Sequence, residues 1–326
     1  MNDQRIARLR EALDAVAGAF LKGLGQLVQR FGQPGRRRGA GPGITVACLS
    51  LLMTLAVSAA AKDYETVAFS PAHLGGAQVS FNVILPHDYA TTTRRFPVLY
   101  LLHGYTGHYS DWATKTGLVE YAKHYEEIIV MPEDENGWYV DNSANPKLGW
   151  QSYIIDDLIP YVDSHYRTVP SRKGRAIAGL SMGGYGAMLM GLKYHQLFAA
   201  AASLSGVLAS AQPAFEEALP VNNPIHEVIK EDFGPLNNPQ RRANDPFELI
   251  REIPVSELPD LYLAIGSSDE LLQMNRDFVH ILSEYRIPYH YCEVPGKHEW
   301  PVWDSQVQRV LALQAPIIGA LPEGSR

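Results

Sequence analysis

The sequence predicts an α/β fold, with a mostly parallel central sheet, helices on both faces, and a helical or irregular insertion at residues 207–255. Short apolar runs alternate with segments of helical composition from about residue 96 onward, which is the order produced by parallel strands joined through helices. A serine flanked by glycines, at residues 179–183, lies between one such run and a helical segment. The 326 residues are enough for one large domain of this kind or for two small ones.

The charge of the chain is unevenly distributed. Residues 1–61 carry eight Lys/Arg against three Asp/Glu, a formal charge of +5, so that residues 62–326 carry −12 of the total of −7. A body this acidic argues against nucleic-acid binding, because phosphate contacts require a basic face. The two cysteines, Cys48 and Cys292, have no metal-ligand spacing and cannot form a disulfide framework in the body.

The first 61 residues read as two segments outside the folded body. Residues 1–35 carry apolar side chains at helical spacing, and no function follows from that pattern. Residues 36–61 combine three arginines, an uncharged run from Ile44 to Ala61, and three final alanines. This is typical of a secretory signal cleaved after Ala61, which predicts a secreted or periplasmic protein. The alternative is an uncleaved membrane anchor through residues 44–61, with the catalytic domain, residues 62–326, outside the cytoplasm.

The first half of the body carries strand signals before any strong helix signal. Tyr64–Ser70 and Gln78–Leu85 alternate well enough to form an antiparallel pair with a turn at Gly75-Gly76. The next strands are expected at Phe96–Leu102 and Glu127–Met131. A polar and aromatic loop follows at residues 133–149, and then a helix at Ser152–His165.

The second half alternates strands and helices more regularly. Apolar runs predict strands at Ala176–Leu180, Phe198–Leu204, Leu261–Ile265 and Tyr289–Val294. Helices are expected at Met182–Leu192, Glu270–Tyr285 and Trp300–Leu313. Prolines and paired asparagines interrupt this rhythm at residues 207–255, so we expect that insertion to form a lid or wall over the functional site.

Ser181 is the candidate nucleophile. It lies at the corner between a predicted buried strand and a predicted helix, and Gly179 and Gly183 complete a G-x-S-x-G pattern. Such a turn strains the serine backbone, and a side chain at either neighbouring glycine would clash. The corner exposes the hydroxyl at the carboxyl edge of the sheet and directs the first helical N–H groups toward any oxyanion formed there.

His298 and Asp269 are the candidate partners of Ser181. A serine hydroxyl needs a general base, usually histidine, whose side chain titrates near neutrality. Working residues of open α/β sheets lie just beyond the carboxyl ends of strands. Among the eleven histidines, His298 follows the last predicted strand, and Asp269 follows the strand before it. The order Ser181, Asp269, His298 is that of the α/β-hydrolase fold.

The loop after the third predicted strand is the candidate oxyanion loop. Two backbone N–H donors are needed to stabilise an oxyanion, and we assign them to Met182, which follows the nucleophile, and Tyr105. His103 and Gly104 precede Tyr105 and are expected to contact substrate. Trp138 and Tyr139, in the aromatic loop, are candidate substrate contacts, with ordinary packing as the equal alternative.

Together these motifs resemble the esterase D-like family of α/β hydrolases, which includes feruloyl, cinnamoyl and acetyl esterases, S-formylglutathione hydrolases and mycolyltransferases. The resemblance covers roughly residues 64–315. It rests on five segments: Leu101–Gly104, Leu158–Arg167, Gly179–Gly184, Gly266–Asp269 and Pro295–Trp300. It implies a serine carboxylesterase that uses this triad and needs neither a cofactor nor a metal.

The expected function is an exported serine carboxylesterase acting on small acyl or aryl esters of the acetyl or feruloyl type, free or linked to carbohydrate. One alternative is an acyltransferase of the mycolyltransferase type, in which an alcohol replaces water. Another is a thioesterase similar to S-formylglutathione hydrolase, which the export signal argues against because those enzymes are typically cytosolic. A non-catalytic binding module with this fold is the third alternative, and the complete triad argues against it.

Overall fold

The computed structural model describes residues 63–220 and 222–321. The predictions made for residues 1–61, both the amphipathic segment and the signal or anchor, lie outside these residues. In the part of the chain that is described, no helix combines the length and the apolar character needed to cross a lipid bilayer.

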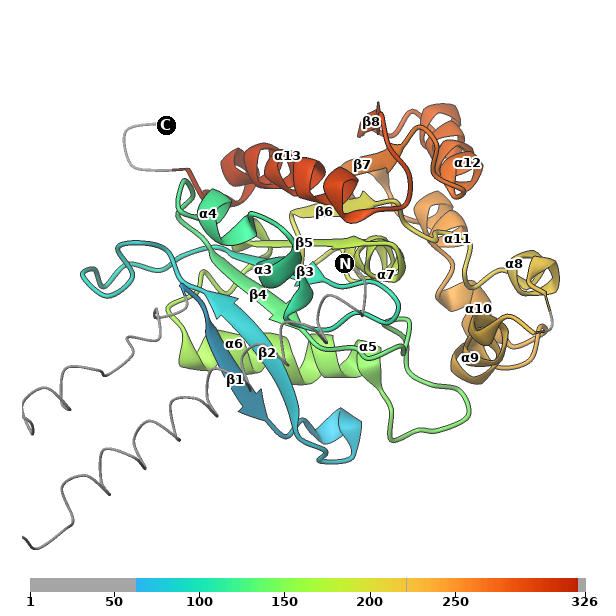
Figure 1. Cartoon of the computed structure of the whole chain (residues 1–326), viewed down its shortest axis with the longest axis horizontal. Helices are drawn as coiled ribbons and strands as arrows, with labels where there is room; N and C mark the ends of the chain where they lie inside the picture. Colours follow the sequence, from blue (N-terminus) through green and yellow to red (C-terminus); the bar gives the residue numbers. More distant parts are fainter. Residues whose placement is uncertain (1–62, 221, 322–326) are drawn as a thin grey trace, which may run out of the picture. The chain divides into compact units, whose positions relative to one another are not determined.

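A single eight-stranded sheet organises the described residues, in the order β1-β2-β4-β3-β5-β6-β7-β8 (Figure 1). The strands are β1 (Glu65–Phe69), β2 (Val79–Ile84), β3 (Val98–Leu102), β4 (Ile128–Pro132), β5 (Arg175–Leu180), β6 (Ala200–Leu204), β7 (Asp260–Gly266) and β8 (His290–Val294). β2 pairs antiparallel with both β1 and β4. All the pairs from β4 through β3 to β8 are parallel, so the carboxyl ends of these six strands meet at one edge of the sheet.

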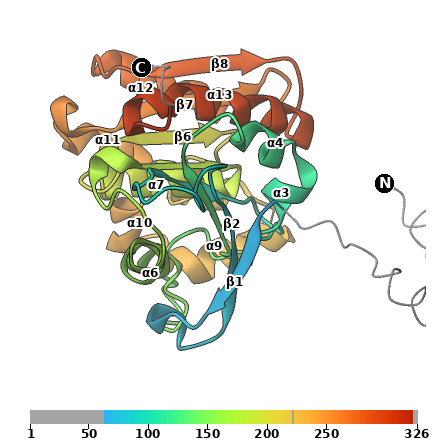
Figure 2. The same ribbon diagram turned by 90° about the vertical axis from the view of Figure 1, so that its left-hand side faces the viewer.

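Helices cover both faces of the sheet. On one face lie α6 (Ile159–His165), α7 (Met182–Lys193) and α12 (Leu272–Glu284), and on the other lie α3 (Asp111–Lys115), α4 (Leu118–Ala122) and α13 (Trp300–Ile318). Figure 2 shows α6 and α13 on opposite sides of the sheet. Alternation of side chains along β3 explains the two layers. Val98 and Tyr100 pack in the core on the face covered by α6, α7 and α12, whereas Leu99 packs in the core on the face covered by α3, α4 and α13.

The predicted fold class is confirmed, and most predicted elements are present within a few residues. The helix expected at Ser152–His165 begins earlier, with α5 (Trp150–Ser152), and passes through π-helical turns at Tyr153–Leu158 before α6. Single 3₁₀ turns occur at Ala72–Leu74, Arg172–Gly174 and Val255–Glu257. The sequence did not predict α3 and α4, because five residues are too few to show a helical period.

The insertion between β6 and β7 contains α8 (Pro213–Ala218), α9 (Pro224–Phe233), α10 (Pro239–Ala243) and α11 (Pro246–Glu252). Each helix begins with a proline, which lacks the N–H that a first helical residue would leave unpaired. The side chains of Asn223, Asn238 and Asp245 cap the last three helices by accepting a backbone N–H. The prolines that interrupt the α/β rhythm of the sequence therefore initiate helices.

Candidate active site

The three predicted catalytic residues come together at the carboxyl edge of the sheet. Ser181 follows β5, Asp269 follows β7 and His298 follows β8. His298 Nε2 lies 2.9 Å from Ser181 Oγ, and His298 Nδ1 lies 2.9 Å from Asp269 Oδ2. The imidazole therefore links hydroxyl and carboxylate in one hydrogen-bonded chain, in which one ring nitrogen faces the nucleophile and the other faces the acid.

Backbone geometry holds Ser181 at the corner between β5 and α7. Its φ of 54° and ψ of −117° are unfavourable for a residue with a side chain. The flanking glycines make the corner sterically accessible. A Cβ on Gly179 would lie 2.3 Å from the Gly183 carbonyl oxygen, and a Cβ on Gly183 would lie 2.4 Å from the His103 carbonyl oxygen. The G-x-S-x-G pattern is thus required by the close approach of three backbone segments.

Asp269 is built to remain ionised. Its side chain is fully buried, and burial alone would raise its pKa. Hydrogen bonds with the His298 ring and the Leu271 N–H instead lower the pKa of Asp269 below its ordinary value. The bond from Leu271 N–H to Asp269 Oδ1 is 2.9 Å long. This bond caps the turn that precedes α12.

Two neighbouring carboxylates that could compete with Asp269, those of Asp277 and Glu293, have other partners. Asp277 lies in α12 and accepts a hydrogen bond from Gln273 at 2.8 Å, and Glu293 pairs with Arg276 at 2.7 Å. Glu270 is exposed. Among the described residues, one group has the spacing of a metal site: ligand atoms of Asp269, Glu270 and His298 lie within 4.8 Å of one another. Two of these three side chains already bond to each other in the catalytic chain.

The loop after β3 places backbone N–H groups beside Ser181. Gly104 approaches the nucleophile closely, since a Cβ there would lie 2.6 Å from Leu180 Cδ1 and 3.3 Å from Ser181 Cβ. The loop is held by the Thr106 N–H, which donates to Asn136 Oδ1 at 2.7 Å, and by the Gly107 N–H, which donates to the Gly104 carbonyl at 2.9 Å. Within the described part of the chain, the N–H of Tyr105 has no acceptor.

The second assigned donor is Met182, the first residue of α7. Its N–H belongs to the first turn of the helix, where N–H groups have no intrahelical acceptor and the helix dipole favours negative charge. Gly104 and Tyr105 line the same cavity as Ser181. The structure therefore brings both assigned donors to the nucleophile, from β3 on one side and from α7 on the other.

His103 has a structural position, contrary to the expectation of substrate contact. Its side chain is 1% exposed. Nδ1 lies 2.9 Å from the Gly104 carbonyl oxygen, and Nε2 accepts the Asp134 N–H at 3.0 Å. Both ring nitrogens are thus used to fix the shape of the oxyanion loop. Glu133 lies beside the same ring, with Oε1 3.1 Å from His103 Nε2, and it accepts the Glu135 N–H at 2.8 Å.

Trp138 and Tyr139 are also buried, at 1% and 0% exposure, and neither lines the cavity. This corrects their assignment as substrate contacts. Both have positive φ, 52° and 54°, in a tight turn that directs their rings inward. The Tyr139 hydroxyl donates to the His103 carbonyl at 3.0 Å, and Trp138 packs against Tyr185 and Phe233. The pair supports the oxyanion loop from behind.

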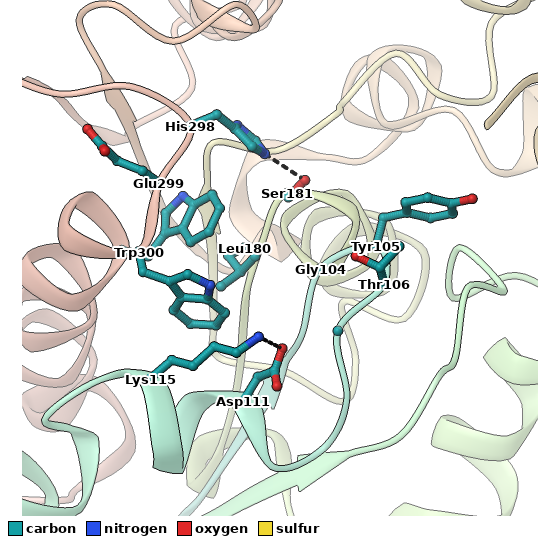
Figure 3. A pocket seen from close by; sticks show the side chains of 12 residues that line it. Gly104, Tyr105, Thr106, Asp111, Lys115, Leu180, Ser181, His298, Glu299 and Trp300 are labelled. Carbon is teal, nitrogen blue, oxygen red and sulfur yellow. Dashed lines mark hydrogen bonds and ion pairs between the residues drawn. The ribbon is translucent and has the colours of Figure 1, made fainter. Parts of the chain in front are cut away.

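A cavity of about 370 Å³ opens at Ser181 and His298 (Figure 3). Sequence reasoning placed Gly104 and Tyr105 there, but it missed the side chains that give the cavity its character. These are Asp111, Lys115, Leu180, Glu299, Trp300 and Trp303. The Trp303 ring meets the His298 ring edge to face, with centroids 4.9 Å apart. That contact, together with the hydrogen bond to Asp269, restrains the orientation of the imidazole.

The insertion does not cover this cavity. None of the lining residues belongs to the described parts of 207–255, so the prediction of a lid or wall is wrong for this cavity. The insertion packs instead on α7 and on the loop that follows β4. The Tyr185 hydroxyl donates to the Asn244 carbonyl at 2.7 Å, and Asn142 Nδ2 donates to Asp232 Oδ1 at 2.6 Å.

The sequence is similar to those of known esterases. The family model described as "Putative esterase" matches residues 73–313. An acetyl esterase of Caldicellulosiruptor saccharolyticus is 32% identical over 216 residues, which is 64% of this chain and 79% of that protein.

Two solved structures of Staphylococcus aureus proteins are similar over 77% of this chain and 97% of theirs. One is FphF, a fluorophosphonate-binding serine hydrolase solved with substrate bound, with a TM-score of 0.68 and 26% identity. The other is an S-formylglutathione hydrolase, FrmB, with a TM-score of 0.66 and 27% identity. The esterase D-like resemblance drawn from the motifs is confirmed. The chain belongs to the Esterase family of serine hydrolases with the α/β-hydrolase fold.

Proposed function

We propose that this protein is an exported serine carboxylesterase that hydrolyses small acyl or aryl esters, of the acetyl or feruloyl type, through an acyl-enzyme. Membership of the family supports carboxylesterase activity. The observation that supports catalysis through an acyl-enzyme is a pair of 2.9 Å hydrogen bonds that connect Asp269 through His298 to Ser181. Ser181 lines a cavity beside the Gly104–Tyr105 loop.

Acylation begins when Ser181 Oγ attacks the ester carbonyl carbon and His298 Nε2 takes the hydroxyl proton. The carbonyl oxygen becomes an oxyanion, which the N–H groups of Tyr105 and Met182 stabilise. Asp269 stays ionised and stabilises the imidazolium. The C–O bond to the alcohol then breaks, and the alcohol leaves with the proton from His298.

Deacylation repeats these steps with water as the nucleophile. His298 takes a proton from water, hydroxide attacks the acyl carbon, and the proton returns to Ser181 Oγ as the acid leaves. Acyl transfer to an alcohol and hydrolysis of a thioester would use the same groups. The three reactions therefore differ in which acceptor and which leaving group the cavity admits, and measured product ratios separate them.

The decisive experiment compares wild type with Ser181→Ala, using p-nitrophenyl acetate and a fluorophosphonate probe. Loss of a triad serine typically costs on the order of a millionfold in turnover. Ser268→Ala is the matched control. This exposed serine precedes Asp269 in the sequence but takes no part in the hydrogen bonds that join Asp269, His298 and Ser181. A Ser181→Ala variant that keeps more than about a hundredth of the wild-type rate would exclude Ser181 as the nucleophile.

The substrate range is tested with p-nitrophenyl esters from acetyl to long-chain, together with methyl ferulate. We expect acetyl and aryl esters to be turned over faster than long-chain esters. Adding an acceptor alcohol should leave the acid as the main product. A transesterified product in excess of the acid would instead support the acyltransferase alternative, and selective turnover of S-formylglutathione would support the thioesterase.

Export is proposed from the basic and uncharged segments at residues 36–61. Protein recovered from outside the cytoplasm should begin at or near Lys62 when its N-terminus is sequenced. An intact N-terminus in a membrane fraction would support the anchored alternative, through residues 44–61.

A further inference from the structure

A charged pair stands at the far end of the catalytic cavity from His298. Lys115 Nζ lies 2.7 Å from Asp111 Oδ2, and both residues belong to α3 and line the cavity. Figure 3 shows this pair beneath Trp300, with Ser181 and His298 at the opposite end. The catalytic steps described above do not use either side chain.

Asp111 is held in place by packing, and the more exposed Lys115 side chain makes two contacts. Between these two residues, Trp112 is 1% exposed and its indole N–H donates to the Leu102 carbonyl at 2.9 Å, which anchors α3 to β3. The Asp111 side chain is 10% exposed and lies against Gly107, where a Cβ would be 2.9 Å from Oδ2. Lys115 Nζ lies 5.0 Å from the centre of the Trp300 ring. The ammonium is therefore positioned by a carboxylate and by an aromatic face.

The size of the cavity suits a ring. A cavity of about 150 Å³ accommodates benzene, so a volume of about 370 Å³ has room for a six-membered ring together with the ester. Trp300 and Trp303 supply aromatic surface along one wall, with ring centroids 5.2 Å apart. Aromatic walls of this kind bind flat rings and the apolar faces of sugars.

The charged residues that line the cavity determine which substituent on a substrate ring can bind there. Lys115 donates hydrogen bonds and Asp111 accepts them, so the pair presents a donor beside an acceptor. A hydroxyl group both donates and accepts hydrogen bonds, so it can pair with both members. A carboxylate is disfavoured, because Asp111 and Glu299 outnumber the single cation among the lining residues.

We propose that the Lys115–Asp111 pair is a specificity site that binds a hydroxyl group on a ring of the ester substrate. The proposal rests on the proposed esterase function and names its substrate class. The ring belongs either to the acyl group or to the alcohol. The chemistry recognised is the same in both cases, and the test separates them.

The test compares esters that differ by one hydroxyl. The acyl arm pairs methyl cinnamate with its 3- and 4-hydroxy derivatives, and the alcohol arm pairs phenyl acetate with 3- and 4-hydroxyphenyl acetate. Comparing wild type with a variant on the same ester cancels the intrinsic reactivity of that ester. Wild type should prefer a hydroxylated ester in one arm by roughly tenfold, the effect expected of one hydrogen bond to charged groups.

Lys115→Met removes the donor and retains most of the apolar stem over Trp300, so the hydroxyl preference should fall to near one. Lys123→Met is the matched control. Lys123 is an equally exposed lysine, at 48% against 44%, and its ion pairs join Asp63 and Glu120. This control should keep the wild-type preference. Fluorophosphonate labelling of Ser181 verifies that each variant is folded, and Lys115→Gln is measured by the same criterion if Lys115→Met is not labelled.

Three results would overturn the proposal: no hydroxyl preference in either arm of the wild type, a preference that survives loss of Lys115, or faster turnover of a 4-carboxy analogue than of the 4-hydroxy ester. In each of these cases Ser181 still reacts and unsubstituted esters are hydrolysed, so the esterase function stands. If no ester is hydrolysed and the probe does not react, the proposed function fails and the specificity site falls with it.

Discussion

Glu127 offers a test of the energetics of this fold, away from the catalytic site. It precedes β4, is 1% exposed, and accepts one hydrogen bond, from Gln314 Nε2 in α13 at 3.0 Å. Its other carboxylate oxygen is buried and has no hydrogen-bond partner among the described residues. Burial raises the pKa of Glu127 from 4.5 to about 8, against the smaller opposing effect of Gln314.

The raised pKa fixes the direction of the effect on stability. At pH 7 the carboxyl group is protonated in the folded protein and ionised in the unfolded chain, so ionisation favours unfolding. Stability contributed by Glu127 is therefore complete below about pH 4.5 and is lost as the pH rises toward 8. Each pH unit across this range costs about 1.4 kcal/mol. The loss between pH 4.5 and pH 7 is about 3 kcal/mol.

Glu127→Gln removes the ionisation and keeps the size of the side chain. We expect the variant to be more stable than wild type by about 3 kcal/mol at pH 7, and by less than about 1 kcal/mol at pH 5. Urea unfolding of the full chain at both pH values, followed by tryptophan fluorescence, measures the two differences. Glu217→Gln, at an exposed position, is the control and should change neither. A variant equally stable as wild type at pH 7, or a gain independent of pH, would refute this reasoning.

Three further predictions follow from contacts in and around the site. Asp269→Asn should lose on the order of ten-thousandfold in kcat near neutral pH, while Glu270→Gln stays within about tenfold; the reverse order in steady-state assays would move the acid by one residue. Gly104→Ala should lower kcat by on the order of a hundredfold, because its methyl group would meet Leu180 and Ser181 at 2.6 and 3.3 Å; unchanged kcat with intact folding by circular dichroism would argue against this approach. Arg241→Met should destabilise the insertion by about 3–5 kcal/mol by leaving Glu216 buried without its partner, and limited proteolysis that finds the insertion equally resistant would contradict it.

The sequence was most informative where local signals and backbone geometry coincide. The corner at Ser181 could be predicted almost to the residue, because the glycines needed for its close approach lie within two positions of it in the sequence. Asp269 and His298 could be predicted from strand order alone, since parallel strands bring their carboxyl ends to one edge. In each case the strand that precedes the residue in the sequence places it at this edge of the sheet.

The side chains around the nucleophile could not be predicted in this way. The sequence left Trp138 open between substrate contact and ordinary packing, and Phe233 from the insertion and Tyr185 from α7 bury its ring. Lys115 carries no motif and belongs to a five-residue helix. Its position in the cavity depends on how α3 packs beside the start of α13. Such positions are set by contacts between segments far apart in the chain, which no local pattern in one sequence reveals.

The position of His298 after an edge strand has a consequence for the heat tolerance of the enzyme. β8 hydrogen bonds to β7 on one side only, and its residues are at best half-buried, whereas every residue of β5 is buried. Detachment of β8 would release one end of the loop that carries His298, while α13 holds its other end in the core through Val302 and Trp303, so the imidazole would lose its fixed distance to Ser181. We therefore expect heating to abolish activity by detaching this edge strand before the central strands separate.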